Sequence, residues 1–219
     1  MNIIVLTGGT SAERNVALAS GKSVAKALRD AGNNVRVIDP IYGIAQPDEE
    51  KIFMDRPAIG KEFPTAEELN LYSNRKVIEC INSDLFDNTD IVFLALHGKF
   101  GEDGRIQSLL ELRGVKYTGT GVTSSAMAMD KNIYKIMFKQ HDISTPKWFM
   151  LKKGNQTELQ VDENIKLQVG YPAVIKPNDE GSTVGLSIVQ PDVEDVQLGK
   201  ALSDAFAYSD NVMAEEYIE

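Results

Sequence analysis

The sequence is poor in the side chains that build disulfides and metal centres. It has one cysteine, Cys80, and two histidines, His97 and His141, among 219 residues. A single cysteine cannot form a disulfide within the chain or supply a zinc cluster, and two histidines leave little room for a His-rich metal site. The sequence therefore excludes a disulfide-stapled scaffold, and no residue is assigned as a metal ligand.

Positive charge and long hydrophobic runs are also scarce. Lysine and arginine total 23 against 32 aspartate and glutamate residues, which gives a formal net charge of −9. Binding to a phosphate backbone needs a basic surface, so nucleic acid is not expected as a partner. No apolar run approaches the length of a membrane span, and the first ten residues lack the basic region of a signal peptide. We expect a cytoplasmic enzyme or binding protein without a membrane partner.

The hydrophobic content of 42% is enough for a real core, and the first part of the chain predicts an α/β fold. Residues 2–6 and 35–38 read as buried strands, and between them lies a helix that ends near Gly32. This β-α-β beginning predicts a parallel, doubly wound sheet. Residues 91–96 are expected to add a further buried strand.

The middle of the chain is less regular. Residues 40–74 are predicted to form an irregular connection with one helix near Glu67. Short helices are expected over residues 76–85 and 107–112, a strand over 115–117, and a single helix over 122–141. The methionines of that last helix are interpreted as core filler.

A second domain is expected after a slight change of composition near residues 119–124. We place a first domain at residues 1–121 and a second at residues 122–219. In the second, strands are predicted over residues 148–151, 173–175, 184–189 and 212–218. Helical segments are expected within residues 154–167 and over residues 192–208.

The most informative stretch is GYPAVIKPNDEGSTVG, residues 170–185. A short apolar strand delivers Lys176 to its end, and Pro177 should stop the sheet pairing there. A turn with Gly181, Ser182 and Thr183 follows. Backbone N–H groups, two hydroxyls and one ammonium suit a phosphate chain, although an ordinary hairpin turn is the alternative. The spacing differs from that of a Walker P-loop.

Two other glycine-rich loops follow predicted strands of the first domain. TGGTS, residues 7–11, comes after the first strand, and HGKFGEDG, residues 97–104, comes after the strand at 91–96. Open α/β sheets bind ligands at such carboxyl ends. The stretch GTGVTS approaches a dinucleotide fingerprint with Ser124 in the third glycine's place. A tight turn between strand and helix is preferred there, with an NAD-dependent dehydrogenase kept as an alternative.

Four motifs taken together resemble the D-alanine–D-alanine ligase family of ATP-grasp enzymes. In chain order they are GGTSAERNVALASG, FLALHGKFGEDGRIQSLLELRGVKYTGTG, MAMDKNIYK and IKPNDEGSTVG. The resemblance runs in register over residues 1–218. It implies a Rossmann-like N-terminal domain with a parallel sheet, followed by the first lobe of an ATP-grasp domain with an antiparallel sheet. It also implies an enzyme that uses ATP to join two D-alanines through an acyl-phosphate, for the peptidoglycan precursor.

The resemblance assigns three residues to the reacting substrates. Glu13 would hold the ammonium of the first D-alanine, because a buried charge needs a partner. His97 would lie beside the same substrate, and Ser182 would orient the reacting groups near Glu13. The alternatives are an acid favoured by a helix N-terminus for Glu13 and a hydrogen-bonded strand-end histidine for His97.

The resemblance also assigns an ATP site. Lys131 and Lys176 would contact phosphates and spread the charge of phosphoryl transfer. Glu215 would accept a hydrogen bond from the adenine amino group. A solvated helix face for Lys131 and a surface strand acid for Glu215 are the alternatives. The full set of ATP-binding residues implied is Lys131, Lys176, Gly181, Ser182, Thr183, Glu215, Glu216 and Ile218.

The sequence departs from the family pattern in a few places. Asn15 and Ala17 stand where the family often has glutamate and serine, and both flank Glu13. Family members continue beyond residue 219 with a second ATP-grasp lobe that carries the magnesium ligands. We therefore expect ATP and magnesium as cofactors, with these 219 residues inactive alone. A non-catalytic nucleotide-binding fragment, a related ligase with another second substrate such as D-lactate, and a homodimer remain open.

Overall fold

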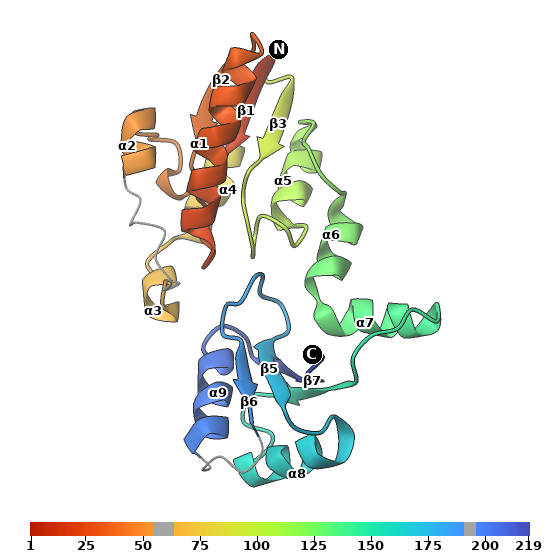
Figure 1. The fold of residues 1–219 in the computed structure, drawn as a ribbon. Helices are drawn as coiled ribbons and strands as arrows, with labels where there is room; N and C mark the ends of the chain where they lie inside the picture. Colours follow the sequence, from red (N-terminus) through yellow and green to blue (C-terminus); the bar gives the residue numbers. More distant parts are fainter. Residues whose placement is uncertain (55–63, 191–195) are drawn as a thin grey trace. The chain divides into compact units, whose positions relative to one another are not determined.

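The computed structural model describes residues 1–54, 64–190 and 196–219. The chain divides into two compact units, residues 1–126 and residues 127–219 (Figure 1). Each unit has its own β-sheet and its own hydrophobic core. In the parts of the chain that the structure describes, every helix is too short or too polar to span a lipid bilayer.

The first unit is built on a three-stranded parallel sheet. Its strands are β1 (Asn2–Leu6), β2 (Asn34–Ile38) and β3 (Ile91–Leu94), in the order β2-β1-β3. Both neighbours of β1 run parallel to it, and the connection from β1 to β2 is the helix α1 (Arg14–Asp30). The predicted β-α-β beginning and the parallel sheet are confirmed.

Successive residues of β1 face opposite sides of the sheet, as the period of a strand requires. Val5 belongs to a core cluster with Leu18 of α1. Leu6 belongs to a different cluster, with Val77 of α4 (Asn74–Ile81) and Leu110 of α5 (Arg105–Arg113). Apolar helix side chains therefore cover both faces, which is the doubly wound arrangement that the sequence predicts.

The connection after β2 contains more helix than the sequence predicts. It holds η1 (Pro40–Tyr42), α2 (Glu49–Met54), α3 (Ala66–Leu69) and, after α4, η2 (Asp84–Phe86). The helix expected near Glu67 is α3. The helix α2 was not predicted, because a six-residue segment with one buried residue, Ile52, shows no periodicity. Residues 55–63 of this connection lie outside the described residues.

Three sequence-based expectations for the first unit are wrong in detail. β3 ends at Leu94, two residues earlier than predicted, although the Ala95 N–H still donates to the Leu6 carbonyl at 2.9 Å. The strand expected over residues 115–117 is a single parallel bridge between Val92 and Tyr117. The predicted short helix over 107–112 is longer and spans α5.

The single helix expected over residues 122–141 is two helices, α6 (Val122–Met129) and α7 (Lys131–Gln140). Asp130 separates them as the N-cap of α7, and its carboxylate accepts the Ile133 N–H at 2.9 Å. The interpretation of the methionines as core filler is wrong for Met137, which is 39% exposed beside Ile136 at 54%, while Met127 and Met129 are half-buried.

The second unit carries a four-stranded antiparallel sheet. Its strands are β4 (Trp148–Lys152), β5 (Ala173–Pro177), β6 (Ser187–Val189) and β7 (Asn211–Glu216), in the order β4-β7-β5-β6. The helices α8 (Glu158–Gln168) and α9 (Val196–Phe206) pack on one face of it, with their apolar side chains in one core cluster with Ile175 and Ala214. This fold of a parallel sheet followed by a separate antiparallel sheet confirms the predicted fold class.

Element ends in the second unit differ from the prediction by a few residues. β6 begins at Ser187 rather than at residue 184, because residues 182–185 form turns. β7 ends at Glu216 and α9 ends at Phe206. The first residues of the predicted helix over 192–208 lie outside the described residues.

Candidate functional site

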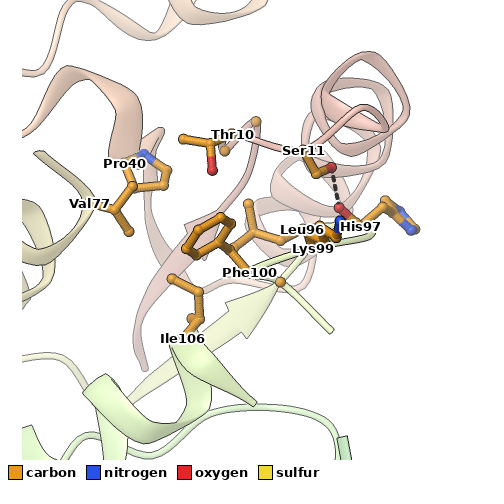
Figure 2. Close-up of a pocket in the computed structure, with 12 residues that line it drawn as sticks. Thr10, Ser11, Pro40, Val77, Leu96, His97, Lys99, Phe100 and Ile106 are labelled. Atoms are coloured by element: carbon orange, nitrogen blue, oxygen red, sulfur yellow. Dashed lines mark hydrogen bonds between the residues drawn. The ribbon is translucent and has the colours of Figure 1, made fainter. Parts of the chain in front are cut away.

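Two loops of the first unit are joined at the carboxyl ends of β1 and β3. These ends lie at one edge of the parallel sheet, so residues 7–13 and 95–104 are neighbours. The Ser11 hydroxyl donates to the His97 carbonyl oxygen at 2.5 Å (Figure 2), and it also accepts the Glu13 N–H at 3.0 Å. Ser11 therefore fixes the loop of Glu13 against the loop of His97.

Glu13 stands at the N-cap position of α1 and is only 7% exposed. Gly98 faces it so closely that a Cβ atom there would lie 2.7 Å from Glu13 Oε2. The structure thus brings Glu13 next to the His97 loop. A carboxylate at a helix N-terminus is also favoured by the helix dipole, so its position is compatible with both interpretations from the sequence.

His97 is half-buried, and its ring is held by α1. Its Nε2 lies 3.1 Å from the Ser20 hydroxyl, an interaction that either tautomer can make with donor and acceptor exchanged. With the Ser11 contact to its carbonyl oxygen, His97 is fixed at both backbone and ring. The hydrogen-bonded histidine expected as the alternative and a substrate-facing histidine are both consistent with this geometry.

A buried ion pair that the sequence analysis missed supports the glycine turn. Arg14 Nη2 lies 2.6 Å from Asp39 Oδ2, and the two residues are 3% and 0% exposed. Asp39 Oδ1 accepts the Gly9 N–H at 3.1 Å, and Arg14 Nη1 donates to the Gly9 carbonyl oxygen at 3.0 Å. Burial raises the pKa of the Asp39 carboxyl, and the Arg14 guanidinium opposes that rise. Two features of the sequence could have indicated this ion pair: an acid directly after β2 and an arginine next to Glu13.

A small cavity of about 10 Å³ lies between these loops. Figure 2 shows residues that line it, among them Thr10, Leu96, Phe100 and Ile106. This volume holds about one water molecule and is too small for an amino acid. Its lining side chains are mainly apolar, so this cavity belongs to the packing of the loops and is not a chamber for a substrate.

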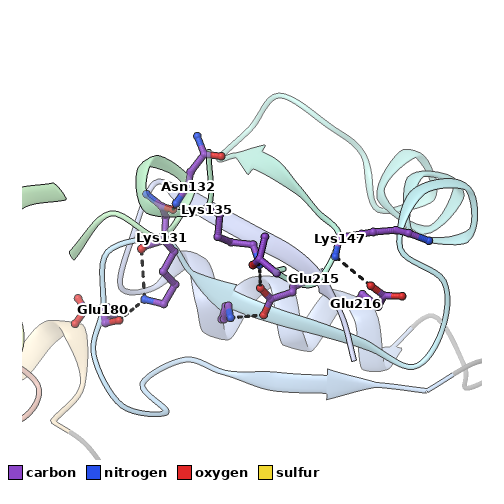
Figure 3. Close-up of polar contacts among 10 residues, drawn as sticks. Lys131, Asn132, Lys135, Lys147, Glu180, Glu215 and Glu216 are labelled. Carbon is purple, nitrogen blue, oxygen red and sulfur yellow. Dashed lines mark hydrogen bonds and ion pairs between the residues drawn. The ribbon is translucent and has the colours of Figure 1, made fainter. Parts of the chain in front are cut away.

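In the second unit, Glu215 of β7 binds two lysines. Lys135 of α7 forms an ion pair with Glu215 Oε1, and Lys176 of β5 forms one with Glu215 Oε2 (Figure 3). Glu215 and Lys135 are buried at 8% and 1% exposure. The alternative interpretation of Glu215 as a surface strand acid is therefore not what the structure shows.

Strand register explains why these residues meet. Val174 is paired with Glu215 and Lys176 with Met213, so Lys176 and Glu215 are diagonal neighbours across two antiparallel strands. Burial alone would raise the pKa of the Glu215 carboxyl, but the hydrogen bonds from Lys135 and Lys176 outweigh it and lower that pKa. The carboxylate is thereby kept ionised in a buried position.

Lys131, at the start of α7, is tied to the turn after β5. Its ammonium donates to the Glu180 carbonyl oxygen and, at 3.4 Å, to that of Asn178. The Asn178 side chain in turn accepts the Asn132 N–H at 2.9 Å. Burial and the nearby Lys176 ammonium lower the pKa of Lys131. Lys131 is thus a half-buried neighbour of Lys176 and not a solvated helix residue.

The remaining predicted ATP residues lie around this cluster. Gly181 is half-buried, and Ser182 and Thr183 are exposed on the turn, where Ser182 has a φ of +49°. A positive φ is uncommon for a residue other than glycine. Glu216 pairs with Lys147, since its N–H donates to the Lys147 carbonyl oxygen at 2.9 Å. Ile218 follows β7 and is 62% exposed.

The structure therefore brings together Lys131, Lys176 and Glu215 in one unit, and Glu13 with the His97 loop in the other. The predicted contact between Ser182 and Glu13 stays a prediction. Lys135 was missed as a site residue, although its position one turn after Lys131 on a predicted helix was the available signal.

Magnesium has no evident site among these residues. Within residues 1–54, 64–190 and 196–219, no group of three or more His, Cys, Asp or Glu side chains is placed to hold a metal ion. Magnesium binding usually needs one or two carboxylates together with substrate phosphates. No described residue is assigned as a magnesium ligand, and no reaction step is assigned to the metal.

Comparisons with known proteins agree along the chain. Residues 2–120 match the family model described as D-ala D-ala ligase N-terminus, and residues 137–219 match the model described as D-ala D-ala ligase C-terminus. A D-alanine--D-alanine ligase from Pediococcus pentosaceus is 35% identical over 100% of this chain and 63% of its own length.

Solved structures of the same kind also resemble the chain. The D-alanine--D-alanine ligase of Bacillus anthracis matches with a TM-score of 0.69 and 30% identity, over 100% of this chain and 58% of that chain. A D-Ala:D-Ser ligase from Enterococcus faecalis matches with a TM-score of 0.70 and 28% identity, over 100% of this chain and 63% of that chain. The chain spans 54% to 63% of the length of the curated relatives it matches.

Proposed function

This chain belongs to the D-alanine–D-alanine ligase family, and from that we propose that it binds D-alanine and ATP as part of an enzyme that joins two D-alanine molecules. In the proposed reaction, the carboxylate of the first D-alanine attacks the γ-phosphate of ATP and releases ADP. The amine of the second D-alanine then attacks the acyl-phosphate carbon, and phosphate leaves with the formation of the peptide bond. The product would serve peptidoglycan synthesis in the cytoplasm.

The observation that carries the proposal is the cluster of Lys131, Lys176 and Glu215. The resemblance assigns two cations and one acid to ATP. Lys176 and Glu215 form an ion pair within the residues that match the C-terminal family model, and the Lys131 ammonium is bonded to the turn that follows Lys176. Ammonium groups stabilise the negative charge of transferring phosphates, and a carboxylate accepts a hydrogen bond from the adenine amino group. A chance surface arrangement would not bury Glu215 to 8% exposure.

The first D-alanine is proposed to bind at Glu13 and His97. Glu13 is buried beside the His97 loop, and its negative charge is complementary to a substrate ammonium. His97, which Ser20 holds through Nε2, would steady the substrate carboxylate. Ser182, exposed on the turn after β5, is proposed to orient the reacting groups when the site is filled.

A ligase with a different second substrate is the second candidate. It is favoured by one specific observation, the likeness over the whole chain to a solved D-Ala:D-Ser ligase. D-Serine and D-lactate are therefore compared with D-alanine as second substrates. Formation of the D-alanyl-D-serine or D-alanyl-D-lactate product in preference to the D-alanine dipeptide would replace the first candidate by the second.

The test combines binding with turnover. Calorimetry of this chain with ATP should show saturable binding, and the natural polypeptide with ATP, magnesium and D-alanine should release phosphate and form the dipeptide.

Glu13→Gln, which removes only the charge, should impair the use of D-alanine and leave ATP affinity near that of wild type. Glu50→Gln, on the exposed side of α2, is the matched control. Absence of ATP binding, or phosphate release without dipeptide, would contradict the proposal.

A further inference from the structure

Lys135 is a buried cation that none of the proposed roles uses. Its side chain is 2% exposed, and its ammonium donates to the Thr145 hydroxyl at 2.7 Å as well as to Glu215. The same nitrogen lies 4.9 Å from the centre of the Trp148 ring. This ammonium is thus met by a carboxylate, a hydroxyl and an aromatic ring (Figure 3 shows Lys135 directed at Glu215).

Burying a lysine ammonium destabilises a protein unless nearby groups pair with its charge. Removing an ammonium from water is unfavourable, and only close polar or oppositely charged partners offset that cost. Lys176 is held less tightly, since its side chain is 16% exposed and it stands at the end of β5 beside the turn with Ser182. Of the two lysines on Glu215, Lys135 is therefore the fixed one and Lys176 the one with access to solvent.

We propose that Lys135 is a positioning residue that fixes the Glu215 carboxylate for recognition of the adenine amino group, which leaves Lys176 available for the phosphates. The inference rests on the proposed ATP site. It adds a residue that contacts the recognising carboxylate and not the nucleotide itself. In the absence of nucleotide, the two lysines neutralise Glu215 from its two oxygens.

The chemistry of the base makes this inference measurable. Adenine presents an amino group, which donates a hydrogen bond to a carboxylate. Inosine triphosphate presents a carbonyl oxygen at the same place, and a carboxylate repels it. The ratio of the ATP and ITP affinities therefore reports whether Glu215 is held in position, whereas phosphate contacts affect both nucleotides alike.

The experiment compares Lys135→Met with Lys139→Met in this chain. Lys139 is on the same helix, and its ammonium lies 5.3 Å from the centre of the same Trp148 ring, but it is exposed. ATP and ITP are titrated by calorimetry into both variants and into wild type, and the melting temperature is recorded. Lys135→Met should reduce the preference for ATP over ITP by about tenfold, as expected for a hydrogen bond to a charged group. Lys139→Met should keep the wild-type preference.

Each outcome supports or overturns the inference. If folded Lys135→Met keeps the wild-type ratio of ATP to ITP affinity, or loses affinity for both nucleotides equally, Lys135 is only structural and the inference is overturned. ATP binding by wild type would still support the proposed function in that case. If the methionine variant does not fold, Lys135→Gln removes the charge and keeps a hydrogen-bonding side chain, and the same ratio is measured. Wild type that binds neither nucleotide would instead refute the proposed ATP site, and with it this role of Lys135.

Discussion

Gly98 lies against the carboxylate of Glu13, where a Cβ atom would come within 2.7 Å of Glu13 Oε2 and within 3.1 Å of Ser11 Oγ. The backbone of Gly98 has a φ of +70°, a conformation that other residues rarely adopt. The Gly98 N–H donates to Glu102 Oε2 at 2.7 Å, and this bond holds the Gly98 backbone in place. The residue that shapes the space around Glu13 is therefore a glycine of the neighbouring loop.

Gly98→Ala should displace Glu13 and raise the D-alanine concentration needed for half-maximal rate, with ATP affinity near that of wild type. The matched control is Gly114→Ala, because Gly114 has a similar φ of +75° and nothing within 4 Å of the place where a Cβ atom would lie. A left-handed alanine costs about 1–2 kcal/mol in both variants, so strain alone cannot separate them. Steady-state kinetics with D-alanine varied would decide, and equal behaviour of the two variants would refute the role of the Gly98 contact.

Lys176→Ala should weaken ATP binding far more than Lys152→Ala. Lys176 is paired with buried Glu215 beside the turn that follows β5, whereas Lys152 is exposed at the end of β4. A charge-assisted hydrogen bond to phosphate contributes about 1.5–3 kcal/mol, which is roughly tenfold or more in affinity. Calorimetric titration with ATP measures both variants, and matching affinities would remove Lys176 from the nucleotide site.

The sequence predicts the fold better than it predicts the contacts of the site. The strands β1, β2 and β5 follow from apolar runs bounded by turns, and these patterns depend only on neighbouring residues. The break at Asp130 was missed because the apolar spacing continues on both sides of it. What ends α6 there is a capping carboxylate together with a bond from the Lys131 N–H to the Asn178 carbonyl oxygen, 47 residues later.

The same distinction holds for the charged residues. Motif resemblance pointed to Lys176 and Glu215 one at a time, and only the pairing of β5 with β7 makes them diagonal neighbours. Lys135 looked like any lysine on a helix, and its burial depends on Thr145 and Trp148. Pairings of this kind involve strand register and helix docking, which no local pattern contains.

Arg14→Met should destabilise the first unit by about 3–5 kcal/mol, because it leaves Asp39 buried without its cation. The Gly9 carbonyl oxygen would also lose its donor. The control is Lys26→Met, which breaks an exposed pair with Asp30 and should cost at most about 0.5 kcal/mol. Hydrogen exchange of the α1 amides measures the opening of this unit. Protection in Arg14→Met equal to that in Lys26→Met would show that the buried pair contributes little.

The stability of the second unit should fall at acid pH through Glu215. The pKa of this carboxyl is lowered from 4.5 in the folded state, because the bonds from Lys135 and Lys176 outweigh burial. Between the folded pKa and 4.5 the unfolded state binds more protons, so stability rises with pH. The contribution of Glu215 is therefore complete above pH 4.5 and is lost as the pH falls through the lower folded value.

Urea unfolding of wild type and Glu215→Gln over a pH series tests this dependence. Trp148, the single tryptophan of the sequence, pairs with Glu215 across β4 and β7, so its fluorescence reports on this unit. The glutamine variant cannot titrate at this position and leaves two lysines without their shared carboxylate, so it should be the less stable protein at neutral pH. The difference in free energy of unfolding between the two proteins should shrink below pH 4.5, since the other titrating groups cancel in that difference. Glu163→Gln, on the exposed side of α8, is the control for removal of a surface carboxylate and should be close to wild type in stability at neutral pH. A Glu215→Gln difference that stays constant across the series would mean that the two lysines do not stabilise the charged form of Glu215.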